Sequence, residues 1–509
     1  MSDPTAPIPT GLALTADEAF EDSVRARRRG DLQDEERHLR RAIGLDRAHV
    51  GALEALARVA AAQGRPAEAA VAEAEVRRWN GNWNTMAPVA TVETAEDPRW
   101  AGYHEALRRA ERPSCGETRR VLIVTNLFPP QEFGGYGRKM WEFAAELRRR
   151  GHAVRVLCAD RPEFVRPGVA GDTDLEDAVE RSLSLYGAWE DGVAHLDPDP
   201  ERIKAIAHDN NQRILDDAYA FDCDACLVGN LDMLANGFLS VLADAGVPVV
   251  HCIGNSTPSY SFRGMPTSPL FRLGPASHWV MGSMARELYN VSRATVLYPG
   301  ARVDLFHRPF PPAFDRLRIA FASLFVDYKG PQVLVEALAL LAERGIDFDC
   351  VFAGEVLDPQ LFDAVRQRCE ALGFGGRVRF QGFLDRLGMI RLLARSNVLV
   401  FPSTYDEPFG ISQVEAMASG VTVVTSATGG SREIVRDGVD GLHFTNGDAD
   451  DLADRLAALA ADPGRWAQLA RAGQERALAF TIARTVDRIE ALFEELGAID
   501  PAQDGLRLL

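Results

Sequence analysis

Short apolar runs alternate with amphipathic segments along most of the chain beyond its first hundred residues. Val121–Thr125 is apolar almost throughout, as is typical of a strand buried on both faces of a parallel sheet. The following segment, 136–150, places Met140, Phe143 and Leu147 at helical spacing. This strand and helix predict the start of an α/β region.

The same alternation returns several times. Further strands are predicted at Ala153–Cys158, Ala225–Val228 and Val247–Ile253, and a second α/β region begins with Arg318–Ala322 and runs to about residue 475. Thr481–Leu496 reads as a final amphipathic helix. Residues 161–220 are acidic and irregular in pattern, and we assign no elements to them.

The first region contains a repeat with a period of 34 residues. Ala16–His49 aligns with Val50–Trp83, so that Gly30 falls over Gly64, and each unit reads as two helices joined by a turn. The period and the small residues resemble tetratricopeptide repeats. Two repeats are few for independent stability, so we expect them to pack on a third helix, on the rest of the chain or on another copy. They are either a plain helical extension or a docking surface for a protein partner or an acceptor.

Composition narrows the classes of function. The net charge of −17 argues against nucleic acid or an anionic membrane as partner. No apolar stretch is long enough to span a membrane, and the first residues lack the pattern of a secretory signal. Seven scattered cysteines fit a reducing compartment, so we expect a cytoplasmic protein. The pair Cys223 and Cys226 is interpreted as reduced thiols beside a strand rather than as a metal or redox site.

The segment Phe401–Gly441 is the most informative part of the chain. An apolar strand, Val398–Ser403, precedes a turn, and Ser412 and Glu415 fit a capping box at the start of a helix that ends at Gly420. A second strand, 421–425, then leads into a Gly-Gly loop at 429–430. In open α/β sheets ligands bind at the carboxyl ends of strands, and a helix start attracts anions. This segment therefore predicts a site for an anionic ligand.

Two carboxylates lie in that segment. Glu407 is on the loop after the strand, and Glu415 is in the first turn of the helix. Carboxylates accept hydrogen bonds from the hydroxyls of sugars and of ribose. In isolation, such a pair is better explained as a helix cap and a surface residue, but the Gly-containing turn, the helix and the Gly-Gly loop favour a binding site.

This arrangement resembles the donor site of family four retaining glycosyltransferases, which have the GT-B fold. Their signature is a Glu, seven residues and a Glu, here Glu407 to Glu415 with Phe409 and Gly410 just after the first. The resemblance implies that Glu407 holds the transferred sugar beside the backbone of Phe409, Gly410 and Ile411. It also implies that Glu415 holds the nucleotide ribose.

A glycine-containing loop follows the first strand. Gly134 and Gly135 let the backbone pass close to a ligand before a helix, although a bare tight turn would look the same. In the resembling family this loop lines the cleft near the diphosphate and acceptor. Arg138 is accordingly an additional phosphate contact.

For Lys329 and His251, a role in binding the donor is implied only by the resemblance to this glycosyltransferase family. Lys329 matches the lysine of a Lys-Gly pair that contacts the donor phosphates, and His251 matches a histidine that binds a sugar hydroxyl. The family usually has an arginine five or six positions before that lysine, where this chain has Ser323 and Leu324. Arg138 or Arg432 would have to supply the missing charge, or the transferase would be slow or inactive.

The resemblance, which covers residues 119–496, implies two Rossmann-like domains facing a cleft, after an all-α repeat region. The predicted boundaries are 1–85 for the repeats, 86–118 for a linker, 119–309 for the acceptor-side domain, 310–480 for the nucleotide-sugar domain and 481–509 for a helix returning to the first domain.

The implied activity is retaining transfer from a nucleotide-sugar co-substrate to an unidentified saccharide, lipid-linked, small-molecule or protein acceptor. No other cofactor is predicted, and without a suitable Asp-x-Asp segment we expect no metal. The departure at Ser323 keeps a second interpretation open, an adaptor with a degenerate sugar-nucleotide site. A phosphorylase would need a cofactor lysine that we do not find, and an epimerase does not fit the Glu pattern.

Overall fold

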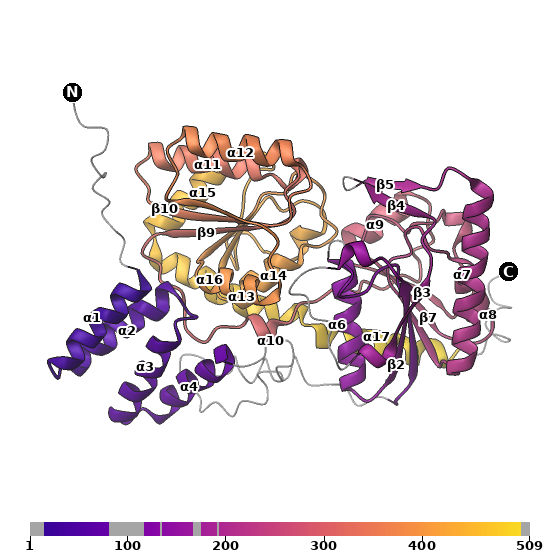
Figure 1. Ribbon diagram of the computed structural model, residues 1–509, viewed down its shortest axis with the longest axis horizontal. Coiled ribbons are helices and arrows are strands. Elements are labelled where there is room, and N and C mark those ends of the chain that lie inside the picture. The colour runs from indigo at the N-terminus through magenta and orange to yellow at the C-terminus, as the bar shows by residue number, and fades with distance from the viewer. Residues whose placement is uncertain (1–14, 81–116, 133–134, 166–174, 191–192, 500–509) are drawn as a thin grey trace.

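The computed structural model describes residues 15–80, 117–132, 135–165, 175–190 and 193–499. They form a helical part and two α/β domains (Figure 1). Gly134, most of the predicted linker and the last ten residues lie outside the described residues. The predicted fold class is confirmed.

The helical part has the four helices that the repeat predicts, α1 (Ala16–Arg28), α2 (Leu32–Leu45), α3 (Val50–Ala62) and α4 (Pro66–Asn80). Thr15 caps α1 in a capping box with Glu18. The turns within each pair use Gly30 and Gly64, with φ of 74° and 72°, a region that glycine enters without steric cost. The resemblance to tetratricopeptide repeats stays a prediction.

The N-terminal α/β domain is built on a six-stranded parallel sheet in the order β3-β2-β1-β6-β7-β8. Helices α6 and α17 lie against one side of this sheet, and α7 and α8 against the other (Figure 1). The bounds of these elements are β1 Arg120–Val124, α6 Tyr136–Arg149, β2 Ala153–Ala159, β3 Val179–Leu183, α7 Pro200–Phe221, β6 Ala225–Val228, α8 Gly237–Asp244, β7 Val249–Ile253, β8 Phe271–Pro275, α9 His278–Arg286 and α17 Ile482–Gly497.

The C-terminal α/β domain repeats this plan with the strand order β11-β10-β9-β12-β13-β14. Helices α11, α12 and α15 cover one face of the sheet, and α13, α14 and α16 lie on the other (Figure 1). The bounds are β9 Leu317–Ala322, α11 Pro331–Glu343, β10 Phe348–Ala353, α12 Pro359–Ala371, β11 Val378–Gln381, α13 Arg386–Ala394, β12 Val398–Phe401, α14 Ile411–Ala418, β13 Thr422–Thr425, β14 Leu442–His443, α15 Ala449–Ala461 and α16 Pro463–Ala477. A connector with α10 (Val303–Phe306) joins the two domains.

The final helix α17 returns to the first domain. Its apolar face, with Val486, Ile489 and Phe493, is buried in the core that also contains strand β1. At the start of α17, Thr485 Oγ1 donates to the carbonyl of Tyr298 at 2.7 Å, on the connector. The two domains are thus linked twice, once by the connector and once by this helix.

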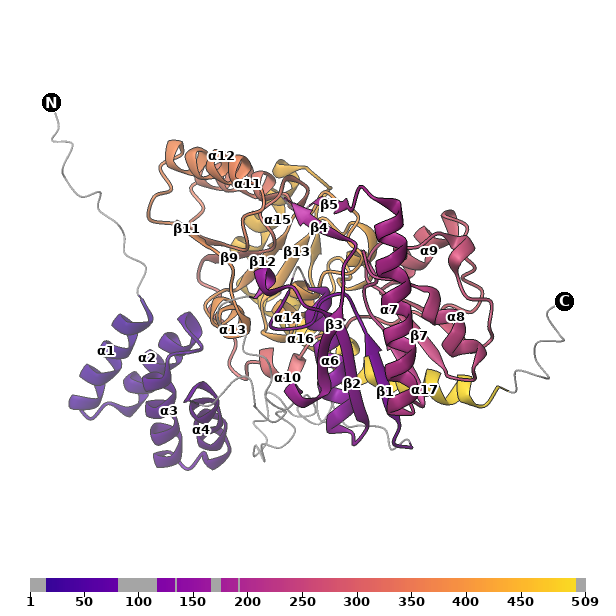
Figure 2. The same cartoon turned by 45° about the vertical axis from the view of Figure 1, so that its right-hand side comes forward.

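The helical part packs on the C-terminal domain (Figures 1 and 2), as one of the predicted alternatives has it. Leu53 and Leu56 belong to one apolar cluster with Leu393 and Met417 from α13 and α14. Alternate residues of the sheet, such as Leu399, point into that cluster, whereas their neighbours face the opposite helices. The repeat helices therefore extend the core of the C-terminal domain.

The sequence pattern missed the structure between residues 161 and 220. A hairpin of β4 (Gly187–Glu190) and β5 (Val193–Leu196) precedes α7, which has 22 residues. Only Asn210, Ile214 and Ala218 of α7 are buried, so its apolar stripe is too narrow to reveal a helical period.

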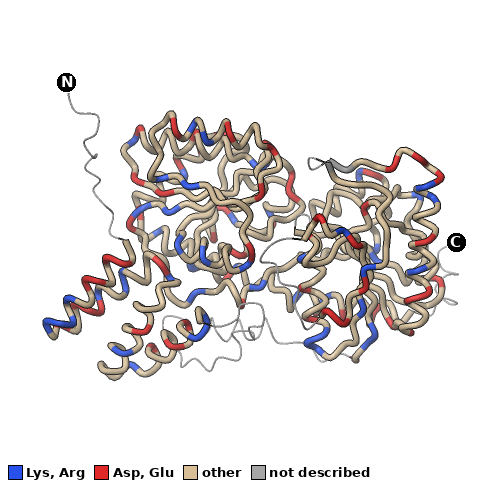
Figure 3. The backbone as a smooth tube through the Cα atoms, viewed as in Figure 1, with Lys and Arg blue, Asp and Glu red and all other residues tan. Residues whose placement is uncertain are grey.

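Charges and thiols give few further constraints. Acidic and basic residues are interspersed over all three parts (Figure 3). The cysteines within the described ranges, including Cys223 and Cys226, are unpaired. Among the described residues we find no helix that is both long and apolar enough to cross a membrane.

Candidate functional site

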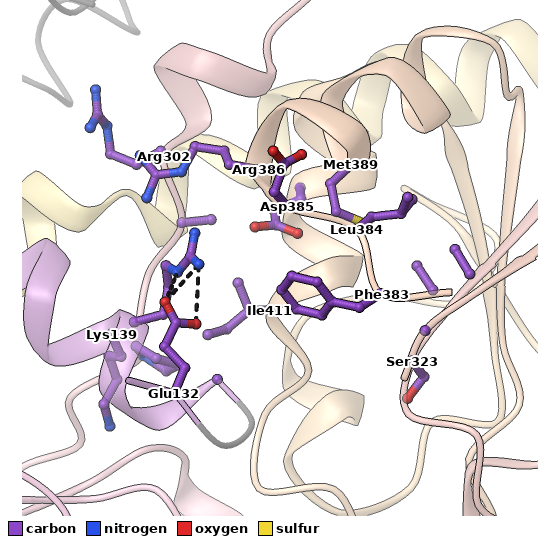
Figure 4. A pocket seen from close by; sticks show the side chains of 18 of the residues that line it. Glu132, Lys139, Arg302, Ser323, Phe383, Leu384, Asp385, Arg386, Met389 and Ile411 are labelled. Carbon is purple, nitrogen blue, oxygen red and sulfur yellow. Dashed lines mark hydrogen bonds and ion pairs between the residues drawn. The ribbon is translucent and has the colours of Figure 1, made fainter. Parts of the chain in front are cut away.

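Two adjoining cavities lie between the α/β domains, at the carboxyl ends of the central strands. The first, of about 400 Å³, is called the Glu415 cavity, and the second, of about 430 Å³, the Glu407 cavity, each after a carboxylate in its wall. They share Gly135, Lys139, Pro299 and Ile411. Figure 4 shows the first cavity, with Glu132 and Lys139 on one wall and Ser323 and Phe383 on the opposite one.

The loop after β12 holds Glu407 in a fixed position. Its side chain is 6 % exposed and forms an ion pair with Lys329. The Ser403 hydroxyl donates to the same carboxylate at 2.6 Å. Hydrogen bonds to charged groups are stronger than neutral ones, so these two contacts orient the Glu407 side chain at the cavity wall.

The Gly-Gly loop supports Glu407 from behind. The Gly430 amide donates to the carbonyl of Glu407 at 2.6 Å. A side chain at Gly430 would meet the Pro408 carbonyl at 2.1 Å, and one at Gly429 would meet the Glu407 carbonyl at 2.5 Å. The two glycines are therefore required for the close approach of these loops.

Helix α14 begins differently from the sequence prediction. Its N-cap is Gly410, with φ of 104°, and no side chain caps the helix among the described residues. The predicted capping box between Ser412 and Glu415 is wrong, because glycine in the left-handed region starts the helix earlier and places Ser412 inside its first turn. Phe409 is buried against Tyr298 and Phe480, with ring centroids at 5.5 and 5.6 Å.

Glu415 and Ile411 on α14 both line the Glu415 cavity. Burial raises the pKa of Glu415 to about 7, although the nearby Arg386 and Arg138 act in the opposite direction. A carboxylate of this kind accepts hydrogen bonds from hydroxyls when it is ionised.

Lys329 ends a short helical turn, Asp327–Lys329, and Gly330 follows with φ of 71°. A side chain at Gly330 would meet the Pro402 carbonyl at 2.1 Å, so glycine lets this turn pack on the loop after β12. The ammonium group thereby reaches Glu407. Ser323 and Leu324, where the family resemblance expects an arginine, line the Glu415 cavity.

The glycine loop leads into α6 on the opposite wall. Gly135 is the N-cap of α6 and borders both cavities, whereas Gly134 lies outside the described residues. Arg138 lines the Glu415 cavity and is paired with Glu132 at 2.7 Å. Arg432, the other arginine considered as a substitute, donates to the Ala427 carbonyl at 3.2 Å and is not among the described lining residues of either cavity.

His251 is buried behind the cavities, with 2 % exposure. Its Nε2 lies 3.0 Å from the Gly229 carbonyl and its Nδ1 lies 2.8 Å from the Tyr260 hydroxyl. Burial lowers the pKa of His251 to about 3, so the ring is neutral. Neither cavity has His251 among its described lining residues, and its contact with a sugar stays a prediction.

Sequence reasoning missed a charged network across the cleft. Arg386, at the start of α13, pairs with Glu142 of α6, and its guanidinium lies 4.9 Å from the ring of Trp141. Arg302, on the connector, lies near the same carboxylate at 3.7 Å. Arg386 follows the carboxyl end of β11, as Glu407 follows that of β12. Because ligands bind at the carboxyl ends of strands, this position is a sequence signal by which Arg386 could have been identified as a site residue.

Comparisons with known proteins find a family match for the C-terminal α/β domain and solved structures with a similar fold. Residues 306–476 match the family described as Glycosyl transferases group 1. The structure of a glycosyltransferase from Rickettsia africae superposes with a TM-score of 0.60 at 17 % identity, over 76 % of this chain and 100 % of that one. Anabaena HepE in complex with UDP and glucose gives a TM-score of 0.56 at 20 % identity, over 74 % and 100 %.

Residues 306–476 thus resemble a Glycosyl transferases group 1 domain, and the two α/β domains have the GT-B fold of these solved structures. Among curated proteins, a D-inositol 3-phosphate glycosyltransferase of Corynebacterium glutamicum is 29 % identical over 217 residues, which are 40 % of this chain and 52 % of that protein. The chain spans about half the length of the curated relatives it matches.

Proposed function

We propose that this protein is a glycosyltransferase that uses a nucleotide diphosphate sugar and retains the configuration at the anomeric carbon. The observation that carries the proposal is Glu407, held by Lys329 and Ser403 in the wall of one cavity, with Glu415 in the wall of the adjoining one. The match to Glycosyl transferases group 1 and a fold neighbour that binds UDP and glucose support it.

Glu407 would accept hydrogen bonds from hydroxyls of the transferred sugar, and Glu415 from the ribose hydroxyls. The backbone of Phe409, Gly410 and Ile411 would lie beside the sugar. Lys329 and the first turn of α14 would stabilise negative charge on the diphosphate as it leaves.

The reaction would break the bond between the anomeric carbon and the phosphate oxygen, with the electron pair leaving on the diphosphate. The acceptor oxygen would form its bond on the same face, and its proton would pass to the leaving phosphate. These steps need no metal ion and no nucleophile from the protein. The acceptor would provide a hydroxyl group of a saccharide, a lipid-linked sugar, a small molecule or a protein. Curated relatives are named D-inositol 3-phosphate glycosyltransferase, which supports a hydroxyl-bearing small molecule among these classes.

The first test is binding of UDP, GDP, ADP and dTDP, measured by thermal shift. A ligand at about 100 times its Kd adds roughly 2.7 kcal/mol of stability. We expect a shift with one nucleotide and its loss in Glu415→Ala. The second test follows release of the nucleoside diphosphate from the matching sugar donor, with water as acceptor. Glu407→Gln should lower this rate by roughly 100-fold or more at unchanged melting temperature.

Asp406→Asn is the matched control for Glu407→Gln, because Asp406 is an exposed carboxylate on the same loop. Full activity in folded Glu407→Gln contradicts the assigned role. The configuration of the released sugar, read by NMR before mutarotation, tests retention, and an unchanged rate in EDTA tests the metal-free mechanism.

The adaptor is the second candidate, because Ser323 stands in the cavity wall where the family resemblance expects an arginine. In that case nucleotide binding would persist while donor turnover stays at background. The helical part would then carry the function through a protein partner, which pull-down with the isolated full chain as bait would identify.

A further inference from the structure

Lys139 occupies an unusual position for a lysine. It lies in the first turns of α6, lines both cavities and is only 6 % exposed. Its ammonium group lies over the ring of Tyr136, 4.2 Å from the centroid. Because Tyr136 is itself held by the carbonyl of Cys252, this contact fixes the lysine at the boundary of the two cavities.

The other cations that border the cavities each have a carboxylate partner. Arg138 pairs with Glu132, Arg302 with Asp304, Lys329 with Glu407 and Arg386 with Glu142. For Lys139, the described residues provide neither a carboxylate within ion-pair distance nor a hydrogen-bond acceptor. Its charge is therefore available to a ligand that enters either cavity.

The stability of the folded protein does not explain a buried lysine at position 139. A buried ammonium without a counter-charge destabilises the folded state, and burial lowers the pKa of Lys139 accordingly. The chain has 56 Lys and Arg residues, of which only Lys139, Lys204 and Lys329 are lysines. Two of the three border the cavities, whereas Lys204 is exposed on α7.

The surroundings of Lys139 suit an anion. Gly135 caps α6 without a side-chain hydrogen bond among the described residues, so the positive end of this helix faces the shared boundary. On the opposite wall Ser323 contributes no charge (Figure 4). A phosphate between these walls would be contacted by Lys139 from the N-terminal domain and by Lys329 from the C-terminal domain.

We propose that Lys139 binds a phosphate group of the substrate at the boundary between the Glu415 and Glu407 cavities. It thereby supplies a cation from the opposite domain in place of the arginine that is absent at position 323. The assignment rests on the proposed function. The phosphate belongs either to the diphosphate of the donor or to a phosphorylated acceptor, and both present the same oxygens to the ammonium group.

Lys139→Met tests this assignment, since methionine keeps the length of the side chain and removes its charge, and Lys204→Met is the matched control. The ligand-free melting temperature of Lys139→Met should equal or exceed that of wild type. Affinity for the nucleoside diphosphate that binds wild type should fall roughly tenfold or more by calorimetry. Lys139→Gln, which stays polar, should behave as Lys139→Met does.

A second titration separates the two sources of phosphate. Inorganic phosphate is added to the protein saturated with nucleoside diphosphate, and binding is followed by thermal shift. If nucleotide affinity is unchanged in Lys139→Met but phosphate binding is lost, the lysine serves a phosphorylated acceptor. If neither changes, or if both variants at position 139 melt well below wild type, the proposal is wrong.

The response to inorganic phosphate distinguishes failure of this proposal from failure of the proposed function. Glu415→Ala should lose nucleotide but keep the response to inorganic phosphate, because the two side chains occupy different walls. If wild type binds phosphate through Lys139 and no nucleotide at all, the proposed function fails while the anion site stands. If wild type binds neither, both fail.

Discussion

Helices α13 and α14 differ sharply at their two ends. Toward the cleft between the domains, Arg386 at the start of α13 and Glu415 within α14 line the Glu415 cavity. At their other ends, Arg47 of the helical part is buried, and its guanidinium donates to carbonyls of the last turns: Ala394 at 3.0 Å and Ser396 at 3.2 Å, together with Leu393 and Ser419. One guanidinium thus satisfies the carbonyls that both helices leave open.

The difference is between an end that contacts the opposite domain and an end that is fixed within one domain. At the cleft, Arg386 is bound to a carboxylate of the opposite domain. At the far end, Arg47 is bonded to backbone oxygens of one domain. The helical part is thereby a support for the two helices that carry site residues, and its docking does not depend on a substrate.

The largest expected effect is at the fixed end. Arg47→Met leaves several buried carbonyls without a donor, and we expect the free energy of unfolding to fall by about 3 kcal/mol. Denaturant and thermal unfolding measure this loss. Nucleotide affinity at a temperature where the variant is folded should also fall, because α13 and α14 lose their common support.

Arg41→Met is the control, since Arg41 is an exposed arginine on α2, the helix that precedes Arg47. It should unfold as wild type does. Equal stability of the Arg47 and Arg41 variants would show that the helical part rests on the domain only loosely, and the contrast between the two helix ends would disappear.

At the cleft end, Glu415 makes stability depend on pH. Its pKa is about 7 in the folded protein, against 4.5 in the unfolded chain. The folded state therefore binds more protons between these values, and stability is lost as pH rises through 7. Relative to Glu415→Gln, wild type should lose about 2 kcal/mol between about pH 5 and pH 8, a figure reduced for partial exposure.

Paired unfolding curves at those two pH values check this expectation. Glu415→Gln should be the more stable protein at the higher pH and the weaker nucleotide binder there, because an NH2 group that only donates replaces one of the two acceptor oxygens of the carboxylate. Parallel pH profiles for the two proteins would mean that the carboxyl is ionised throughout, as an exposed glutamate is.

Local patterns explain which parts of the site could be predicted. Glu407, Glu415 and their glycines lie within one strand–loop–helix unit, so their short separation in the sequence keeps them close in the structure. Parallel strands buried on both faces, such as β1 and β12, are apolar throughout and were found for that reason. The repeat helices were found because their small residues recur at a fixed period.

Features that depend on distant contacts could not be predicted. The pairing of Glu142 with Arg386 joins residues far apart in the chain, and nothing in either local sequence specifies the partner. Arg47 looks like any helix-end arginine until the docked domain provides four carbonyls. The burial of His251 likewise follows from Tyr260 and Gly229 packing around it. The start of α14 differs from the prediction because Ser412 and Glu415 have capping-box spacing, whereas the helix is in fact started by Gly410.

The smallest expected effect tests how the fixed end is itself held. Trp79 of α4 donates from Nε1 to the carbonyl of Arg47 at 3.1 Å and packs in the same apolar cluster. Trp79→Phe keeps most of the apolar contact but removes this donor, so the free energy of unfolding should fall by about 1 kcal/mol. Combined with Arg47→Met, the two losses should be less than additive, because the tryptophan acts through the position of the arginine. Full additivity in this double-mutant cycle would instead mean that Trp79 contributes only its own packing.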